Sequence, residues 1–274
     1  MPSALIRYEA TDNLVLRLGG FKSLVRPSIG QLAPRVLAER DGDDSEVEIG
    51  NPNLKPYKAW NLDAGAEWYF ASASVLQSGF FYKNIKDYIV EQNLEDYSYN
   101  GFAYDEALVR FNSGEDATIK GFEIGYSQSF RMLPAPFDGL LANVNYTYTD
   151  ADGKVPTEDS GMRDIPLLNS SRHTFNVALG YEKGPVSLRV AGTFRDKYLD
   201  ELGDDPELDR YVRKHFQLDA SAKLRVYQGV QLFAEWVNIN NAKYVAYQNH
   251  AVGRRLLQFE KYSYTAKFGV KANF

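Results

Sequence analysis

The end of the chain, Tyr262–Phe274, alternates between apolar and polar side chains, and this alternation strongly constrains the fold. The apolar register comprises Tyr262, Tyr264, Ala266, Phe268, Val270, Ala272 and Phe274, and the polar register comprises Ser263, Thr265, Lys267, Gly269, Lys271 and Asn273. Successive side chains of a strand point to opposite faces, so the stretch predicts a strand with one apolar and one polar face. Its length of about a dozen residues suits a tilted strand that crosses a membrane.

The same alternation recurs along most of the sequence and predicts about eleven long strands. The clearest repeats are Trp60–Phe70, Leu140–Tyr148, His173–Tyr181 and Phe216–Val226. Short turns between strands alternate with long stretches that lack the pattern, which we interpret as loops rather than strands: 23–56, 91–116, 150–169, 200–211 and 241–256. Short turns on one side and long loops on the other are typical of outer-membrane barrels. The predicted fold is an all-β, antiparallel, up-and-down transmembrane β-barrel.

Composition agrees with this fold and excludes several classes of function. The net charge of −5 argues against a nucleic-acid partner, and the absence of cysteine excludes disulfide scaffolds and thiolate metal sites. Aromatic residues make up 14% of the chain and cluster near predicted strand ends, like the interfacial girdles of membrane barrels. Soluble β-sandwiches also alternate. The strand length and the confinement of charge to one face favour the membrane barrel.

Four stretches resemble TonB-dependent outer-membrane receptors, specifically the C-terminal half of their barrel. They are Asn13–Pro27, which ends in Ser-Leu-Val-Arg-Pro, Gly50–Pro56, which reads Gly-Asn-Pro-Asn-Leu-Lys-Pro, Phe233–Asn241 and the terminal Phe274. The Gly50–Pro56 motif is the most specific of the four. The resemblance extends over essentially the whole chain.

This resemblance implies a barrel of about 22 strands with a plugged lumen. Residues 1–274 would form the C-terminal part of that barrel, with the signal peptide, the plug domain and the N-terminal barrel strands absent. The implied partners are outer-membrane lipid, the plug domain and the missing half of the barrel, TonB through the absent N-terminal segment, and the barrel-assembly machinery, which would read Phe274. Ser3–Glu9 and the terminal strand would then be unpaired edges, so the isolated chain is not expected to transport a substrate.

The sequence contains no recognisable catalytic, phosphate-binding or metal motif, so we predict neither enzyme activity nor a cofactor. By the resemblance, extracellular loops and lumen-facing side chains would contact substrate. The candidates are Arg26, Arg35, Tyr97, Tyr99, Tyr104, Arg163, Arg172 and Arg189. For any one of them, a solvated side chain is the simpler interpretation. Aromatic faces suit sugars, whereas Arg with Tyr suits anionic ferric siderophores, so the sequence does not choose between these two substrate classes.

Three functions remain to be separated. The first is the barrel of a receptor for TonB-energised uptake of a large nutrient, either a ferric siderophore or an oligosaccharide. The second is a passive porin, which needs a polar pore without a plug. The third is a soluble β-rich domain that binds a ligand, which would partition into buffer rather than detergent.

Overall fold

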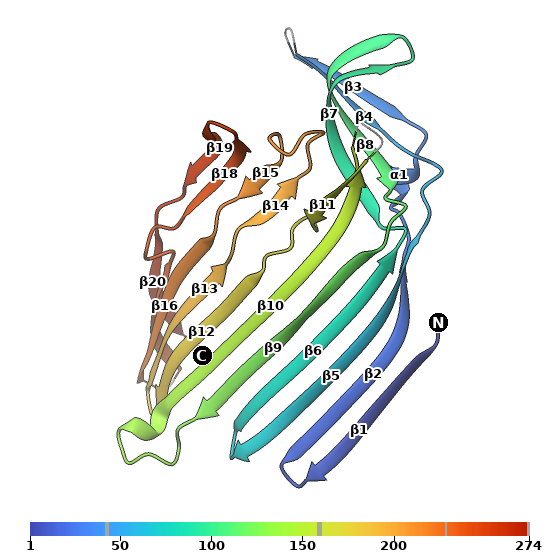
Figure 1. The fold of residues 1–274 in the computed structure, drawn as a ribbon. Helices are drawn as coiled ribbons and strands as arrows, with labels where there is room; N and C mark the ends of the chain where they lie inside the picture. The colour runs from blue at the N-terminus through green and yellow to red at the C-terminus, as the bar shows by residue number, and fades with distance from the viewer. Residues whose placement is uncertain (42–43, 158–160, 228, 273–274) are drawn as a thin grey trace.

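The structure, a computed structural model, describes residues 1–41, 44–157, 161–227 and 229–272 and consists mainly of one large antiparallel sheet (Figure 1). Its strands follow the order β1-β2-β5-β6-β9-β10-β12-β13-β16-β17-β20, and the short β11 pairs with β10. The strands of this order are β1 (Ser3–Thr11), β2 (Leu14–Val25), β5 (Tyr57–Ala71), β6 (Ser74–Lys86), β9 (Ala117–Ser129), β10 (Leu140–Pro156), β12 (His173–Lys183), β13 (Val186–Arg195), β16 (His215–Tyr227), β17 (Val230–Val237) and β20 (Thr265–Ala272). The prediction of about eleven long antiparallel strands is confirmed.

One face of this sheet, the outer face, is apolar and exposed. Residues paired directly across neighbouring strands share a face, so the row Tyr146–Phe175–Phe194–Phe216 lies on one side of the sheet. The same face exposes 64% of Phe80 and 85% of Phe268. An apolar surface of this extent is unfavourable in water and suits hydrocarbon.

Aromatic side chains form two bands on the outer face, one near each end of the strands. In the upper band, the ring centroids of Phe175 and Phe194 lie 4.9 Å apart, and those of Phe175 and Phe216 lie 6.1 Å apart. In the lower band, Phe70 stacks on Tyr126 at 6.0 Å. Two such bands with an apolar zone between them are the girdles expected of a membrane-spanning barrel.

The connections differ sharply at the two ends of the sheet, with short turns at one end and long segments at the other (Figure 1). β12 and β13, for example, are joined by a two-residue turn at Gly184, whose positive φ of 57° suits glycine. β1 and β20 are the two edges of the sheet, and no pairing joins them in the part of the chain that the structure describes. No described helix is long and apolar enough to cross a membrane.

The interpretation of the long connections as structureless loops was wrong. They contain α1 (Ile29–Leu32), β3 (Val36–Asp41), β4 (Asp44–Ile49), β7 (Ile89–Tyr99), β8 (Phe102–Asn112), β11 (Met162–Pro166), β14 (Tyr198–Glu201), β15 (Arg210–Val212), β18 (Lys243–His250) and β19 (Gly253–Lys261). These strands form two further sheets, β3-β4-β8-β7 and β14-β15-β18-β19. Each sheet combines strands from different connections, a long-range pairing that local alternation does not reveal.

Two strand boundaries also differ from the prediction. The last strand starts at Thr265 instead of Tyr262, because Ser263 adopts a positive φ of 62° that interrupts an extended chain. The loop predicted to begin at residue 91 is preceded by an earlier break at Asp87, where φ is 56° and which separates β6 from β7. The terminal Phe274 lies outside the described residues.

Candidate substrate-capture site

The long connections pack together as one assembly, which we call the loop assembly (residues 26–56, 87–116, 157–172 without the undescribed positions, 196–214 and 238–264). A cluster of buried side chains lies within it and at the adjoining strand ends: Tyr88, Val90, Ala117, Val155, Ile165, Leu199 and Leu202. These residues come from four segments that are distant in sequence. A shared hydrophobic core of this kind resists independent movement of the segments.

Backbone hydrogen bonds reinforce this core between segments. The amide of Asn93 donates to the carbonyl of Leu202 (2.9 Å), and the amide of Asn169 donates to that of Leu199 (2.8 Å). The side-chain amide of Gln92 donates to the carbonyl of Gly203 (3.1 Å). The segment around β14 is therefore attached both to β7 and to the connection between β11 and β12.

A buried ion pair locks β11 to the connection between β14 and β15. The guanidinium of Arg163 donates from Nη1 and Nη2 to the two carboxylate oxygens of Asp209, both at 3.0 Å, and from Nη2 to the carbonyl of Gly203 at 3.2 Å. Burial raises the pKa of Asp209, while the hydrogen bonds from Arg163 act in the opposite direction. Arg163, predicted as a substrate contact, thus has a bracing role within the assembly.

A second network joins α1, β4, β7 and β8 around Arg110. Its side chain is 9% exposed and pairs with Glu48 at 2.8 Å and with Glu91 at 2.9 Å. Gln31 donates from Nε2 to the same Glu91 oxygen at 2.9 Å. Burial opposes ionisation of Glu91, but the hydrogen bonds from Arg110 and Gln31 prevail and lower its pKa.

The Gly50–Pro56 motif is explained by its place in this network. A Cβ on Gly50 would lie 1.9 Å from the carbonyl oxygen of Ala33, so only glycine fits. The amide of Asn51 donates to the carbonyl of Gln31 (2.8 Å), and its side chain donates to that of Arg110 (2.9 Å). The motif therefore joins the connection after β2 to the connection after β6.

One face of the β3-β4-β8-β7 sheet bears a row of four glutamates that the sequence analysis did not single out. Glu39 lies opposite Glu46, Glu46 opposite Glu106, and Glu106 opposite Glu95. Burial raises the pKa of Glu106, and the charges of Glu46 and Glu95 add to this. Like charges directly opposite each other destabilise a sheet, so this row is a costly arrangement. A hollow of about 310 Å³ adjoins the row.

Three predicted tyrosines lie together on the β7–β8 hairpin. Tyr97 is opposite Tyr104, and Tyr99 is opposite Phe102, so by register all four rings share one face near the hairpin tip. Phe102 is 67% exposed. Glu95 and Glu106 are the next pair of this parity along the hairpin, on the far side of Asp96, whose φ is 49°. The hairpin therefore bears both aromatic rings, which stack on sugars, and carboxylates, which accept hydrogen bonds from hydroxyl or ammonium groups.

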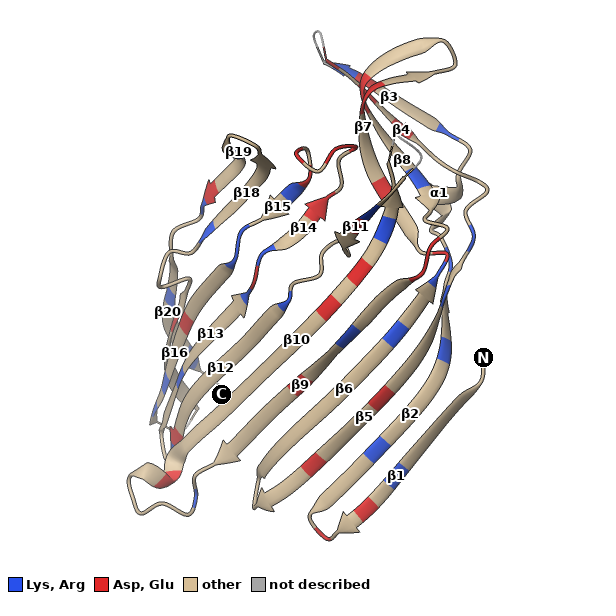
Figure 2. Ribbon diagram, in the orientation of Figure 1, with Lys and Arg blue, Asp and Glu red and all other residues tan. Residues whose placement is uncertain are grey.

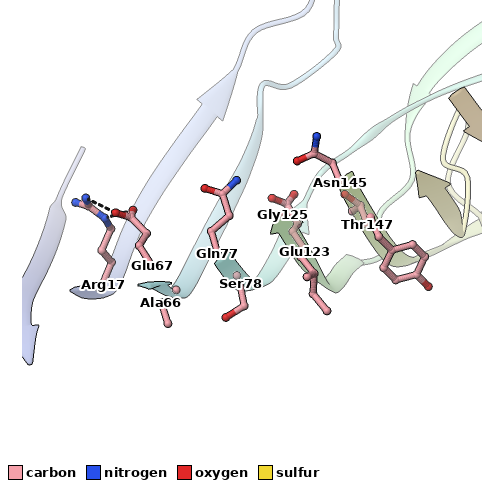
Figure 3. A pocket seen from close by; sticks show the side chains of 13 residues that line it. Arg17, Ala66, Glu67, Gln77, Ser78, Glu123, Gly125, Asn145 and Thr147 are labelled. Atoms are coloured by element: carbon pink, nitrogen blue, oxygen red, sulfur yellow. Dashed lines mark hydrogen bonds and ion pairs between the residues drawn. The ribbon is translucent and has the colours of Figure 1, made fainter. Parts of the chain in front are cut away.

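The inner face of the wall provides a separate polar surface. Figure 3 shows Arg17, Glu67, Gln77, Glu123 and Asn145 pointing to the same side of the sheet, opposite to Ala66 and Ser78. Arg17 and Glu67 form an ion pair at 2.7 Å. Side chains are absent from this row at Gly65, Gly79 and Gly125, and a pocket of about 260 Å³ results. The predicted polar inner register is thus present.

The remaining predicted candidates do not join the tyrosine cluster. Arg26 and Arg35 are exposed at either side of α1, and Arg172 pairs with Asp150 at 3.1 Å at the upper end of the inner wall. Arg189 lies midway along β13, opposite Gly180 and Ser221. The described residues contain no group of three or more His, Cys, Asp or Glu suited to a metal ion.

Sequence reasoning missed the glutamate row, Arg110 and Asp209. A signal was present for the row, because Glu46-Val47-Glu48-Ile49 alternates as a strand does, and Val47 is 3% exposed. Arg110 lies opposite Glu91 on the β7–β8 hairpin, but its other partner, Glu48, and the partner of Asp209 lie on other connections, which local sequence does not indicate.

Comparisons with known proteins agree with this architecture. The family model described as "TonB dependent receptor-like, beta-barrel" matches residues 1–240. No curated protein sequence matches the chain. Among solved structures, a variant of the ferric enterobactin receptor PfeA from Pseudomonas aeruginosa, crystallised with enterobactin, superposes with a TM-score of 0.67 at 18% identity, over 100% of this chain and 40% of that one.

Two other receptors are similar. The ferric-catecholate import receptor Fiu of Escherichia coli K12 gives a TM-score of 0.64 at 16% identity, over 99% of this chain and 34% of Fiu. The siderophore receptor PirA of Acinetobacter baumannii gives a TM-score of 0.63 at 15% identity, over 100% of this chain and 41% of PirA. The chain therefore spans about 40% of the PfeA and PirA chains. At these identities the likeness concerns the fold. With the family model matched over most of its length, the chain belongs to the TonB-dependent receptor β-barrel family, which is a family of outer-membrane receptors and not of enzymes.

Proposed function

We propose that this chain forms part of the wall and of the ligand-capturing loops of a receptor for TonB-energised uptake of a large nutrient, a ferric siderophore or an oligosaccharide. The observation that carries the proposal is the loop assembly with its shared core. Loops fixed in advance bind a ligand without first losing conformational entropy, which increases affinity. A pore that admits small solutes passively has no need of such an assembly.

The energy requirement distinguishes the receptor from a passive porin. Cells that carry the receptor are offered a labelled nutrient with and without a protonophore, and with and without functional TonB. We expect saturable uptake that is lost in both treated samples. Uptake that persists in both and rises linearly with concentration would support the porin. The third alternative, a soluble ligand-binding domain, does not fit a family located in the outer membrane.

The tyrosines and the glutamate row favour a neutral or cationic ligand over an anionic one. The row of Glu39, Glu46, Glu106 and Glu95 repels anions, and Tyr97, Tyr99 and Tyr104 offer stacking surfaces. An oligosaccharide or an uncharged ferric siderophore meets both conditions.

A binding panel tests this preference. The panel contains neutral oligosaccharides, a neutral ferric siderophore and a ferric tris-catecholate. Replacing Tyr97 and Tyr104 by Ala together should weaken binding of the preferred ligand roughly 30-fold or more, at ~1–3 kcal/mol per stacking ring. Tyr227→Ala is the matched control, because Tyr227 is 75% exposed at the turn end of the wall. Preferred binding of the tris-catecholate would contradict the assignment.

The remaining partners form part of the same proposal. We infer that residues 1–274 pair with further barrel strands at β1 and β20, and that the polar inner face, including Arg172 and Arg189, contacts a plug domain or the passing substrate. The unpaired edges support this, since exposed strand edges are prohibitive in lipid. Cysteine pairs placed on β1 and on the adjoining strand should crosslink in intact membranes. Absence of a crosslink at every register tried would refute the pairing.

A further inference from the structure

The β7–β8 hairpin turns at Asn100 and Gly101, the two residues between its strands. Both have a positive φ, 51° and 84°, as a type I′ turn requires, and Asn-Gly is a dipeptide that suits this turn. Both residues are exposed, and the hairpin lies at the top of the molecule in Figure 1. The geometry of the turn thus accounts for the pair, which also places an amide side chain next to an unhindered backbone nitrogen.

The backbone nitrogen of Gly101 is free to react. Its N–H donates no hydrogen bond among the described residues, because the ladder of the hairpin begins only with the pair Tyr99 and Phe102. Nothing lies within 4 Å of the position that a Cβ on Gly101 would occupy, and glycine carries no side chain that would hinder the nitrogen itself. The side-chain carbonyl carbon of Asn100 is therefore open to attack by this nitrogen, which would close a five-membered ring.

Other asparagines with the same backbone conformation lack this freedom. A positive φ is also found at three further described asparagines: Asn169, Asn238 and Asn241. The amides that follow them belong to Ser170, Ile239 and Ala242, and each donates a hydrogen bond of 3.2 Å or shorter. An amide held in this way has to break its hydrogen bond before it can approach the side chain of the preceding residue.

The Asp-Gly pairs in β10 and directly before it are enclosed by packing. An added Cβ on Gly139 would lie 2.9 Å from the carbonyl oxygen of Glu182, and one on Gly153 would lie 2.7 Å from the hydroxyl of Tyr88. Close-packed surroundings resist the change of backbone conformation that ring closure requires. Asn100 therefore combines features that these pairs lack: an exposed side chain, a following glycine and open space around both.

We propose that Asn100 is a site of spontaneous deamidation, with water as the only co-reactant. The nitrogen of Gly101 loses its proton to solvent and bonds to Cγ of Asn100, while the bond from Cγ to the side-chain nitrogen breaks and ammonia leaves. Water then opens the resulting succinimide. Cleavage at Cγ restores the ordinary backbone, with aspartate at position 100. Cleavage at the backbone carbonyl carbon gives isoaspartate, whose main chain runs through the side-chain carbons.

Both products change the tip of the hairpin. The residues from Tyr97 to Tyr104 carry no charge (Figure 2), so deamidation adds a first negative charge among these aromatic rings. Aspartate is compatible with the left-handed conformation and preserves the turn. Isoaspartate lengthens the main chain of a two-residue turn by one carbon, which disturbs the pairing of Tyr99 with Phe102. The effect on ligand binding rests on the function proposed above, whereas the modification itself does not.

The modification is measured on the intact receptor, which is kept in its outer membrane and incubated in mildly alkaline buffer made with heavy-oxygen water. Peptide mass spectrometry then locates each amide that has been replaced by a newly labelled carboxyl group. We expect label to accumulate at Asn100, partly as isoaspartate, which a protease specific for aspartate does not cleave. Asn169 is the internal control, because it is also exposed and has a positive φ of 59°. An unmodified Asn100, or equal labelling of both residues, would overturn the assignment.

The variant Asn100→Gly keeps a dipeptide that suits the turn and removes the reactive amide. Labelling of this peptide should be lost in the variant, and labelling that persists would show that another residue reacts. Affinity for the ligand preferred in the binding panel is compared before and after incubation. Wild type should lose affinity and Asn100→Gly should keep it. Labelling of Asn100 without any loss of affinity would confirm the modification and count against the tyrosines as the ligand-binding surface.

Discussion

The wall and the loop assembly of this protein are both made of strands, yet they are stabilised in different ways. Few side chains of the wall are buried. Those on its outer face, such as Leu179, which is 60% exposed, require a lipid environment. The loop assembly has a core of its own, in which Val155 and Leu199 are fully buried. The stability of the wall therefore depends on strand pairing in lipid, whereas that of the loop assembly depends on packing, on the buried Arg163–Asp209 pair and on the partly exposed network around Arg110. Changes to these groups should release the loops and leave the wall intact.

The largest effect is expected from Arg163→Met. Loss of the guanidinium leaves Asp209 charged, 5% exposed and unpaired, which costs about 3–5 kcal/mol of the loop assembly's stability. Hydrogen exchange of β14 and β15 should accelerate accordingly, with the wall unchanged. The double variant Arg163→Met with Asp209→Leu removes both charges and should recover most of the protection. If the single variant exchanges as slowly as wild type, the ion pair does not brace the loops.

A slightly smaller effect is expected from Leu199→Ala in the shared core. Truncation of this buried side chain leaves a cavity and costs about 2–5 kcal/mol. Because the core is shared, proteolytic sensitivity should rise in 87–116 as well as in 196–214. Ile29→Ala, at an 88% exposed position, should change stability by less than ~0.5 kcal/mol. Sensitivity confined to 196–214 would show that the segments fold independently.

Gly50→Ala tests the close packing within the first connection, residues 26–56. The added Cβ meets the backbone of Ala33, so the cost is about 1–3 kcal/mol of local stability. Limited proteolysis should then cut within 26–56 before any other segment. At Gly30 the nearest atom to an added Cβ is 3.8 Å away, and Gly30→Ala should be tolerated. Equal cleavage of the two variants would contradict the role assigned to Gly50.

The smallest expected effect on stability is at the glutamate row, where a substitution should stabilise the fold instead of destabilising it. The pKa of Glu106 is raised above its ordinary value of 4.5, so its ionised form destabilises the folded sheet. This penalty is fully present above the raised pKa and fades as the pH falls through it. Glu106→Gln should stabilise the β3-β4-β8-β7 sheet by roughly 0.2–1 kcal/mol at pH 7. Exchange of β8 amides at pH 7 and near pH 5 measures this, and a destabilised variant at pH 7 would contradict it.

The comparison also explains what the sequence could and could not predict. The wall was predictable because each strand has a polar and an apolar register, which are visible locally, as in Trp60–Phe70. The predicted strand boundaries were wrong where single residues adopt a positive φ, as at Asp87 and Ser263. The strands within the long connections were not predicted because their pairing is long-range: β4 pairs in parallel with β8 across some sixty residues.

Part of the candidate site could likewise be predicted from the sequence, and part could not. The clustering of Tyr97, Tyr99 and Tyr104 follows from a single hairpin, which local sequence brings together. The partner of Arg163 is Asp209, on another connection, and no pattern near Arg163 indicates it. A charged residue in a polar stretch is compatible with a ligand contact and with a buried brace, and only the fold distinguishes the two.

The central claim is that the long connections fold as one preformed assembly above the wall. Hydrogen exchange of the unliganded receptor in lipid nanodiscs tests it most directly. The account predicts that amides in 89–112 and 198–212 exchange slowly, and that both segments lose protection together in Arg163→Met. Exchange of these segments at the rate of an unstructured chain, beside a protected wall, would contradict it.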